Sequence, residues 1–248
     1  STDSSIEIAR AHGAELHHFE WIHDFSAARN YSWDQMKTDW IVWLDSDDLF
    51  VGREYLDEIV TKAEDLALDG VVLEYLYAFD AIGVQQLQKL EPGILARQIP
   101  SKSVYDQLRP RCMTTQWRER IIRRTPEWRW AYPIHEALPS GGKRLGKYDK
   151  VKVIHRRHLR ASQVVVRRNL DILLRVPPEK RDERIWFKLG LESAHHATVG
   201  DAIHAFEKYL EIGTLEDERY LAHCYLGDLY RAQGDRTRAT ASYLRGTD

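Results

Sequence analysis

The chain has 248 residues, of which 43% are hydrophobic and 30% are charged, a balance that is ordinary for globular proteins. Its 36 basic and 38 acidic residues give a formal net charge of -2, so no basic excess points to a nucleic-acid binder. No apolar run approaches the roughly 20 residues that a membrane-spanning helix needs, and the length suits one large domain or a medium domain with a smaller one.

The first segments of the chain alternate between helix and strand patterns. Residues 4–12 predict a helix, residues 15–19 a short strand and residues 26–37 a second helix. Residues 40–44 (WIVWL) are continuously apolar, which is typical of a fully buried strand in a parallel sheet. These elements open an α/β pattern.

The next segments continue this alternation. Residues 52–70 carry apolar side chains at helical spacing, and residues 71–79 predict the following strand. Helices and strands in this order predict an α/β fold with a mostly parallel sheet. Residues 117–124 alternate like an edge or antiparallel strand, and residues 148–158 contain another alternating strand, so the middle of the chain predicts a mixed sheet with loops.

From about Ala161 the chain becomes helical, and a motif of small and aromatic residues recurs there at one constant offset. The first copy is Leu189, Gly190, Ala202, Ala205 and Phe206, and the second is Leu226, Gly227, Ala239, Ser242 and Tyr243. Small residues opposite aromatic ones let paired helices stack closely, and the pattern resembles tetratricopeptide repeats, whose period is about 34 residues. We therefore expect an α/β domain over residues 1–160 and an all-α, tetratricopeptide-like region over residues 161–248.

Three carboxylates, those of Asp45, Asp47 and Asp48, directly follow the apolar run at 40–44. Open α/β sheets bind ligands at the carboxyl ends of their strands, and Mn²⁺ or Mg²⁺ takes hard oxygen ligands together with diphosphate oxygens. A plain helix cap would also explain these residues. So would a phosphatase of the haloacid-dehalogenase type with Asp45 as nucleophile, although Leu49 stands where that family has threonine.

The run from residue 19 to residue 48 contains W-x-x-D-F-S-x-x-R-N followed by W-x-x-x-L-D-x-D, and it resembles the family 2 glycosyltransferases. It is similar in particular to the branch that includes lipopolysaccharide-core glucosyltransferases and transferases fused to tetratricopeptide repeats. The resemblance implies a GT-A fold, in which a Rossmann-like mixed sheet flanked by helices binds a nucleoside diphosphate sugar. Only Ser1, Thr2 and Asp3 match the family's opening motif, so we expect the first strand to be missing.

The resemblance implies roles for individual residues on the donor side. Asp3 matches the position that reaches the base or ribose of the nucleotide, and Arg29 matches a cation on the nucleotide side. Asp45 matches a ribose or metal-water position, and Asp47 matches the direct metal ligand. His155, after a predicted strand, resembles a late histidine that completes the metal shell in some of these enzymes.

A second stretch, residues 117–138, resembles the W-x-x-x-I-H-E-x-L segment of the same branch. An inverting transferase needs a base for the acceptor proton, and Glu136 of I-H-E is the candidate, with His135 beside it as a substrate-binding residue. The alternative is that Glu136 forms a cap or a salt bridge and His135 is structural. Three arginines of the predicted strand would either face the departing diphosphate or line a solvent-exposed edge: Arg118, Arg120 and Arg123.

Together these features predict a metal-dependent inverting glycosyltransferase that moves a hexose from a nucleoside diphosphate sugar to a saccharide, lipid or protein acceptor. A metal-dependent phosphohydrolase and a non-catalytic, repeat-containing adaptor are the alternatives. The helical repeats would offer a groove for a protein partner or for self-association. Cys112 and Cys224 match no metal or redox spacing, which fits a reducing compartment. We therefore expect a cytoplasmic protein, with peripheral association at the inner membrane face as a further option.

Overall fold

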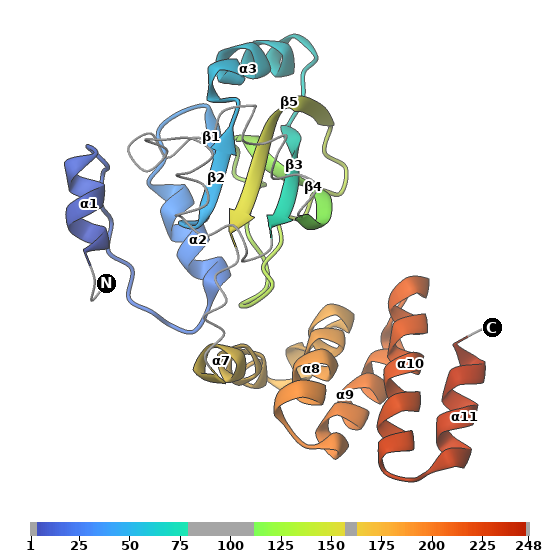
Figure 1. The fold of residues 1–248 in the computed structure, drawn as a ribbon. Helices are drawn as coiled ribbons and strands as arrows, with labels where there is room; N and C mark the ends of the chain where they lie inside the picture. Colours follow the sequence, from blue (N-terminus) through green and yellow to red (C-terminus); the bar gives the residue numbers. More distant parts are fainter. Residues whose placement is uncertain (1–3, 79–111, 157–162, 247–248) are drawn as a thin grey trace. The chain divides into compact units, whose positions relative to one another are not determined.

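The computed structural model describes residues 4–78, 112–156 and 163–246, which form one mixed sheet and a series of helices (Figure 1). The chain divides into two compact units. The sheet unit comprises Asn30–Trp130 and Leu138–Arg160, and the helical unit comprises Ser1–Arg29, Ala131–Ala137 and Ala161–Asp248. The mixed α/β class followed by a helical region is confirmed, while the division into domains at residue 160 stays a prediction.

The sheet contains five strands in the order β1-β4-β3-β5-β2. They are β1 (Trp40–Val42), β2 (Asp48–Val51), β3 (Gly70–Ala78), β4 (Cys112–Arg123) and β5 (Leu145–Arg156). Among these described strands β3 and β5 pair in parallel, whereas β1 with β4, β3 with β4, and β2 with β5 pair antiparallel. The expectation of a mostly parallel sheet is therefore wrong, because a continuous apolar run does not report strand direction. The expectation of a fully buried strand over 40–44 is also wrong, because Ile41 is buried while Val42 and Leu44 are 38% and 42% exposed.

The strand β4 lies inside the sheet, and both of its faces are covered. Ile121 and Ile122 are consecutive and both fully buried, so they point to opposite faces. Ile121 packs with Ile59 of α3 (Leu56–Asp65), which follows the 3-10 turn η1 (Arg53–Tyr55). Ile122 packs in a second cluster with Trp33 of α2 (Phe25–Asp34) and with Trp128. The sheet is thus flanked on both faces. Of the two alternatives predicted for residues 117–124, the antiparallel strand is confirmed and the edge position is wrong.

Two predictions for the first part of the chain differ from the structure: the strand at residues 15–19 and the length of the helix at residues 52–70. The helix α1 (Ser5–Ala11) is present, but residues 15–19 form no strand and their side chains are largely exposed. An isolated extended segment without a neighbouring strand leaves its backbone groups to water. The helix expected over 52–70 ends at Asp65, and Ala67 has a φ of 51°, a left-handed conformation that stops the helix before β3.

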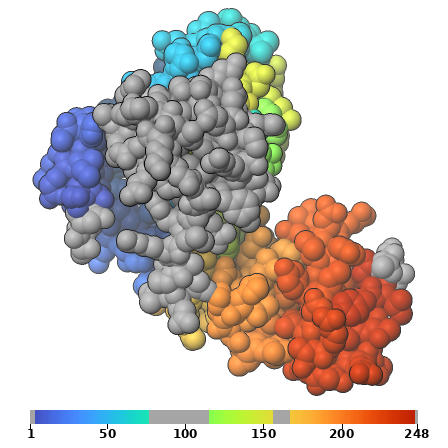
Figure 2. Space-filling view, viewed as in Figure 1, coloured from blue at the N-terminus to red at the C-terminus, as the bar shows by residue number. Residues whose placement is uncertain are grey.

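The helical unit contains α7 (Gln163–Leu174), a 3-10 turn η3 (Pro178–Lys180), α8 (Glu183–His196), α9 (Val199–Ile212), α10 (Glu216–Ala232) and α11 (Arg236–Arg245). The space-filling view shows the residues of α8 to α11, in orange and red, as one continuous body of atoms (Figure 2). The small residues of the sequence motif are buried at their contacts: a Cβ on Gly190 would lie 2.7 Å from the ring of Phe206. Gly227 meets Tyr243 in the same way. The assignment to tetratricopeptide repeats stays a prediction.

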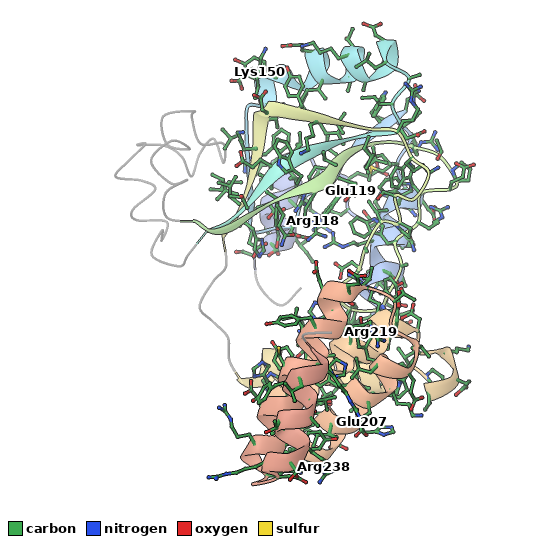
Figure 3. The ribbon with its side chains drawn as sticks, turned by 90° about the vertical axis from the view of Figure 1, so that its right-hand side faces the viewer. Arg118, Glu119, Lys150, Glu207, Arg219 and Arg238 are labelled. Atoms are coloured by element: carbon green, nitrogen blue, oxygen red, sulfur yellow. The ribbon has the colours of Figure 1, made fainter. Side chains whose placement is uncertain are left out.

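A groove of about 630 Å³ lies between α9, α10 and α11. Its lining includes Glu207, Arg219 and Arg238, one from each helix, which are labelled in Figure 3. The lining carries both positive and negative side chains, so the charge of the groove does not predict the charge of a ligand. In the described part of the chain, no helix is both long and apolar enough to cross a bilayer.

Candidate functional site

Carboxylates and an imidazole converge where β2 and β5 pair in the sheet unit. Asp48 opens β2 and lies directly opposite His155 of β5 in the antiparallel register. Ligand atoms of Asp45, Asp48 and His155 all lie within 4.8 Å of one another, and Nδ1 of His155 lies 3.5 Å from Oδ1 of Asp47. The pairing of β2 with β5 therefore brings the acidic stretch next to His155, although the two lie far apart in the sequence.

Asp48 is the centre of the cluster and its side chain is fully buried. Its Oδ1 accepts hydrogen bonds from the hydroxyl of Tyr75 at 3.1 Å and from Nδ1 of His155 at 3.0 Å. Its Oδ2 accepts from Nη1 of Arg120 and from the backbone N–H of Asp45, both at 3.0 Å. These four hydrogen bonds occupy the lone pairs of the carboxylate. Asp48 therefore holds its neighbours in place, although its oxygens also lie close enough to Asp45 and His155 to share an ion with them.

Arg120 is the buried cation that balances this negative charge. It is the extra residue of a β-bulge, because Val71 pairs with Ile121 and Val72 with Glu119, and bulges redirect side chains near functional sites. Figure 3 labels Glu119, the residue before it in the sequence, on β4. The guanidinium carbon lies 3.7 Å from the ring centroid of Trp43 and 4.1 Å from that of Tyr75.

The sequence alternatives for Arg120, a diphosphate contact or a solvent-exposed edge, both assumed an accessible side chain. Its exposure is 0%, and in the described part of the chain its Nε and Nη2 atoms have no hydrogen-bond partner. The sequence signal that could have identified it is the acidic stretch itself. A buried carboxylate needs a buried cation, and Arg120 stands in the apolar strand β4.

The pKa values of the cluster follow from burial and pairing. Burial raises the pKa of Asp48, but the hydrogen bond from His155 and the charge of Arg120 outweigh it, so the pKa lies below its ordinary value. The hydrogen bond to Asp48 raises the pKa of His155 against the effect of burial, and the charges of Asp47 and Asp45 add to this. Burial lowers the pKa of Arg120, which Asp48 opposes. A metal that binds His155 would therefore compete with a proton for the ring.

The donor atoms present fit a divalent metal. Asp45 and Asp47 offer hard carboxylate oxygens, and His155 adds an imidazole nitrogen, a combination that suits Mn²⁺ and is compatible with hydrated Mg²⁺. Asp48 holds the ring of His155 through Nδ1, as carboxylates commonly orient a ligating histidine. This observation, that one buried carboxylate fixes both the Asp45 backbone and the His155 ring, is the structural argument for a metal site.

The other predicted site residues lie in the helical unit, except Asp3, which falls outside the described residues. Nε of Arg29, in α2, donates to Oε1 of Glu136 at 2.7 Å, and the two side chains are 24% and 14% exposed. Nε2 of His135 lies 3.0 Å from Oε1 of Glu192 in α8. The structure thus brings Arg29 to Glu136 and pairs His135 with a residue that the sequence did not indicate.

Residues 131–137, here called the I-H-E loop, form a tight and well-anchored turn. Ala131 and Ala137 exchange backbone hydrogen bonds of 2.9 and 3.0 Å. Within this loop Tyr132 and His135 have φ values of 74° and 54°, in the left-handed region that residues with a side chain seldom adopt. The carbonyl of Pro133 accepts from the backbone N–H of Phe25 at 2.9 Å.

The fold and the cluster define an α/β protein with a candidate divalent-metal site at the end of a short strand. The model of the family described as Glycosyl transferase family 2 matches residues 1–130, more than half of the chain, and the chain therefore belongs to that family. The matched range includes α2, the acidic stretch and Arg120, and it ends directly before the I-H-E loop. No curated protein matches the chain.

Proposed function

We propose that this glycosyltransferase is metal-dependent and inverting, and that it moves a hexose from a nucleoside diphosphate sugar to a hydroxyl of a saccharide, lipid or protein acceptor. The observation that carries the proposal is the convergence of Asp45, Asp47 and His155 around the buried Asp48 in a chain of this family. That arrangement offers oxygen and nitrogen ligands in one place, held by a fixed second layer of hydrogen bonds.

The donor side of the reaction is assigned to the sheet unit. Asp45, Asp47 and His155 would hold Mn²⁺ or Mg²⁺, and the bound metal would supply positive charge to the departing diphosphate. Asp48 keeps the Asp45 backbone and the His155 ring in place through its two oxygens. Asp3 is proposed to contact the nucleotide, as the family resemblance implies.

The acceptor side is assigned to the I-H-E loop in the helical unit. A single displacement at the anomeric carbon needs a group that takes the acceptor proton, and the sequence nominates Glu136 with His135 as a substrate contact. The charge-assisted hydrogen bond from Arg29 fixes the orientation of Glu136. Arg29, which the resemblance implies for the nucleotide side, would then act on this loop as well.

The test is calorimetric titration of the full chain with UDP, GDP, CDP and dTDP, with and without Mn²⁺. We expect metal-dependent binding of one nucleotide and a loss of at least about tenfold in affinity in Asp47→Asn, as removal of a metal ligand implies. The matched control is Asp57→Asn, an exposed carboxylate in the first turn of α3, which should bind like the wild type.

Absence of nucleotide binding, or binding that Asp47→Asn leaves unchanged, would contradict the proposal. Release of phosphate from p-nitrophenyl phosphate without any nucleotide preference would favour the metal-dependent phosphohydrolase. Partner binding that is insensitive to Asp47→Asn, together with no donor turnover, would favour the non-catalytic adaptor.

A further inference from the structure

Tyr75 of β3 shares one face of the sheet with the candidate metal site. It pairs with Val153 of β5, and Val153 pairs with Phe50 of β2, in three neighbouring strands that Figure 1 shows side by side. Asp48 lies two residues before Phe50 in β2. His155 likewise lies two residues after Val153 in β5, and side chains two residues apart in a strand point to the same face. Strand pairing therefore brings Tyr75 next to Asp48 and His155.

Two contacts of Tyr75 act on the imidazole of His155. The Tyr75 hydroxyl donates to Oδ1 of Asp48 at 3.1 Å, and the same oxygen lies 3.0 Å from Nδ1 of His155. The Tyr75 ring stacks on the imidazole, with ring centroids 5.7 Å apart and an angle of 28° between the planes. The stacking restricts the tilt of the imidazole, and the hydrogen bond fixes the oxygen that Nδ1 contacts.

Tyr75 is itself held in place by its surroundings. It is 2% exposed and belongs to the apolar cluster that contains Ile59 of α3 and Val151 of β5. The guanidinium carbon of Arg120 lies 4.1 Å from the centroid of its ring, and a cation over an aromatic face is attracted to that face. A ring packed in this way has little freedom to rotate, so Tyr75 can impose one orientation on His155.

The imidazole distinguishes this site from one that is built only of oxygen atoms. Of the three proposed ligands, Asp45 and Asp47 offer carboxylate oxygens, whereas His155 offers a nitrogen. Mg²⁺ takes hard oxygen ligands and keeps several of its waters. Mn²⁺ is a softer transition-metal ion and binds an imidazole nitrogen more readily than Mg²⁺ does. A loosely held imidazole should therefore weaken the binding of Mn²⁺ more than the binding of Mg²⁺.

We propose that Tyr75 is a positioning residue that determines the metal preference of this site. It holds the imidazole of His155 in place and thereby favours Mn²⁺ over Mg²⁺. Tyr75 is not a metal ligand in this proposal, because its hydroxyl is engaged with Asp48, and it acts through Asp48 and His155 alone. The proposal rests on the metal-dependent function proposed above, to which it adds a residue and a preference between the two ions.

The experiment measures the binding of Mn²⁺ alone and of Mg²⁺ alone to the full chain, without any acceptor. Electron paramagnetic resonance measures free Mn²⁺, and the Mg²⁺ affinity follows from its displacement of bound Mn²⁺. Tyr75→Phe keeps the ring and removes only the hydroxyl. It should lower the Mn²⁺ affinity at least about tenfold, as loss of a group that orients a metal ligand does, and the Mg²⁺ affinity by less than about threefold.

Two further variants relate the effect to His155. His155→Ala should lower the Mn²⁺ affinity by at least as much, and Tyr75→Phe should cause no further loss in that background. The matched control is Tyr243→Phe, which also removes a hydroxyl that donates to an aspartate, Asp228 at 2.7 Å, but in the helical unit. It should bind both ions like the wild type. Equal losses for the two ions in Tyr75→Phe, or an additive loss in the double variant, would overturn the proposal.

A second measurement does not require that Tyr75→Phe folds. Electron spin-echo envelope modulation of the wild type with Mn²⁺ should show coupling to an imidazole nitrogen, and its absence would overturn the proposal. Wild-type binding of Mn²⁺ that Tyr75→Phe leaves unchanged would defeat the role of Tyr75 and leave the metal-dependent function intact. A wild type that binds neither ion, alone or with the nucleotides of the calorimetric titration, would defeat both proposals.

Discussion

At the scale of single residues, the fully buried pair of Asp48 and Arg120 is the most consequential feature. Removing one partner of a buried ion pair leaves the other charge without compensation, which costs about 3–5 kcal/mol. We expect Asp48→Asn to lower the free energy of unfolding by about that amount, measured by urea denaturation. The double variant Asp48→Leu, Arg120→Met should lose less than the single one, because it removes both charges.

A loss below about 1 kcal/mol in Asp48→Asn, the range of exposed pairs, would contradict the burial of this pair. Asp57→Asn again serves as the control, since its carboxylate is exposed on α3.

The pair of Asp48 and Arg120 also shows what the sequence could reveal at this scale. The acidic stretch predicts Asp45 and Asp47 as site residues, but the four hydrogen bonds that Asp48 accepts come from β3, β4, β5 and the turn before β2.

Those partners depend on strand register, which no local pattern specifies. Arg120 points to the carboxylates only because one extra residue in β4 shifts the register beside Val71 and Val72. A regular strand would have sent it elsewhere. His155 could be named from a family resemblance, while Glu192 could not. Its contact with His135 spans two segments that no spacing rule connects.

At the scale of elements, the repeated contact of a glycine with an aromatic ring is the clearest agreement between sequence and structure. A Cβ on Gly190 of α8 would stand 2.7 Å from Phe206 of α9, closer than any carbon atoms pack. We expect Gly190→Ala to lower the free energy of unfolding by about 1–3 kcal/mol, as overpacking does. Thermal unfolding followed by circular dichroism would measure this.

Gly200 of α9 is the matched control, because its nearest neighbour to an added Cβ is the Thr198 hydroxyl at 3.7 Å. Gly200→Ala should be neutral or slightly stabilising, since alanine favours the helix. Equal stability of the two variants would mean that α8 and α9 do not approach each other as closely as the contact implies.

Helices with a sequence motif were therefore predictable, whereas strand directions were not. The run at 40–44 correctly indicated a strand, yet only Ile41 of β1 is buried, in a cluster with Trp33 and Trp128, and the strand pairs antiparallel with β4. The segment at 15–19 has strand-like composition but finds no partner strand. In both cases the outcome depends on what packs against the segment, which is tertiary information.

At the scale of the whole molecule, the helical unit combines three separate stretches of chain. A protein that ends at residue 160 would therefore lack the helices that bury Ile134 and hold His135. We expect the backbone N–H groups of Ala131 and Ala137, which are hydrogen-bonded in the full chain, to exchange with deuterium much faster in the truncated protein.

Hydrogen exchange followed by mass spectrometry would measure this, with peptides from β3 and β4 as the internal control. Unchanged protection of residues 131–137 after truncation would show that the loop is stable without the helices. It would then support the sequence-based boundary at residue 160 over the grouping of segments in the structure.

The interleaving of the two units also bears on the order in which they can be completed during synthesis. The sheet unit has all of its residues once Arg160 has been made, whereas residues 1–29, which are made before the sheet unit, belong with helices that are made after it. Residues 1–29 must therefore stay without their final contacts until those helices have been made. Contacts between distant segments slow folding, and exposed apolar residues in that interval favour aggregation. Trp21 and Ile22, which are 41% and 59% exposed even in the folded chain, lie within residues 1–29.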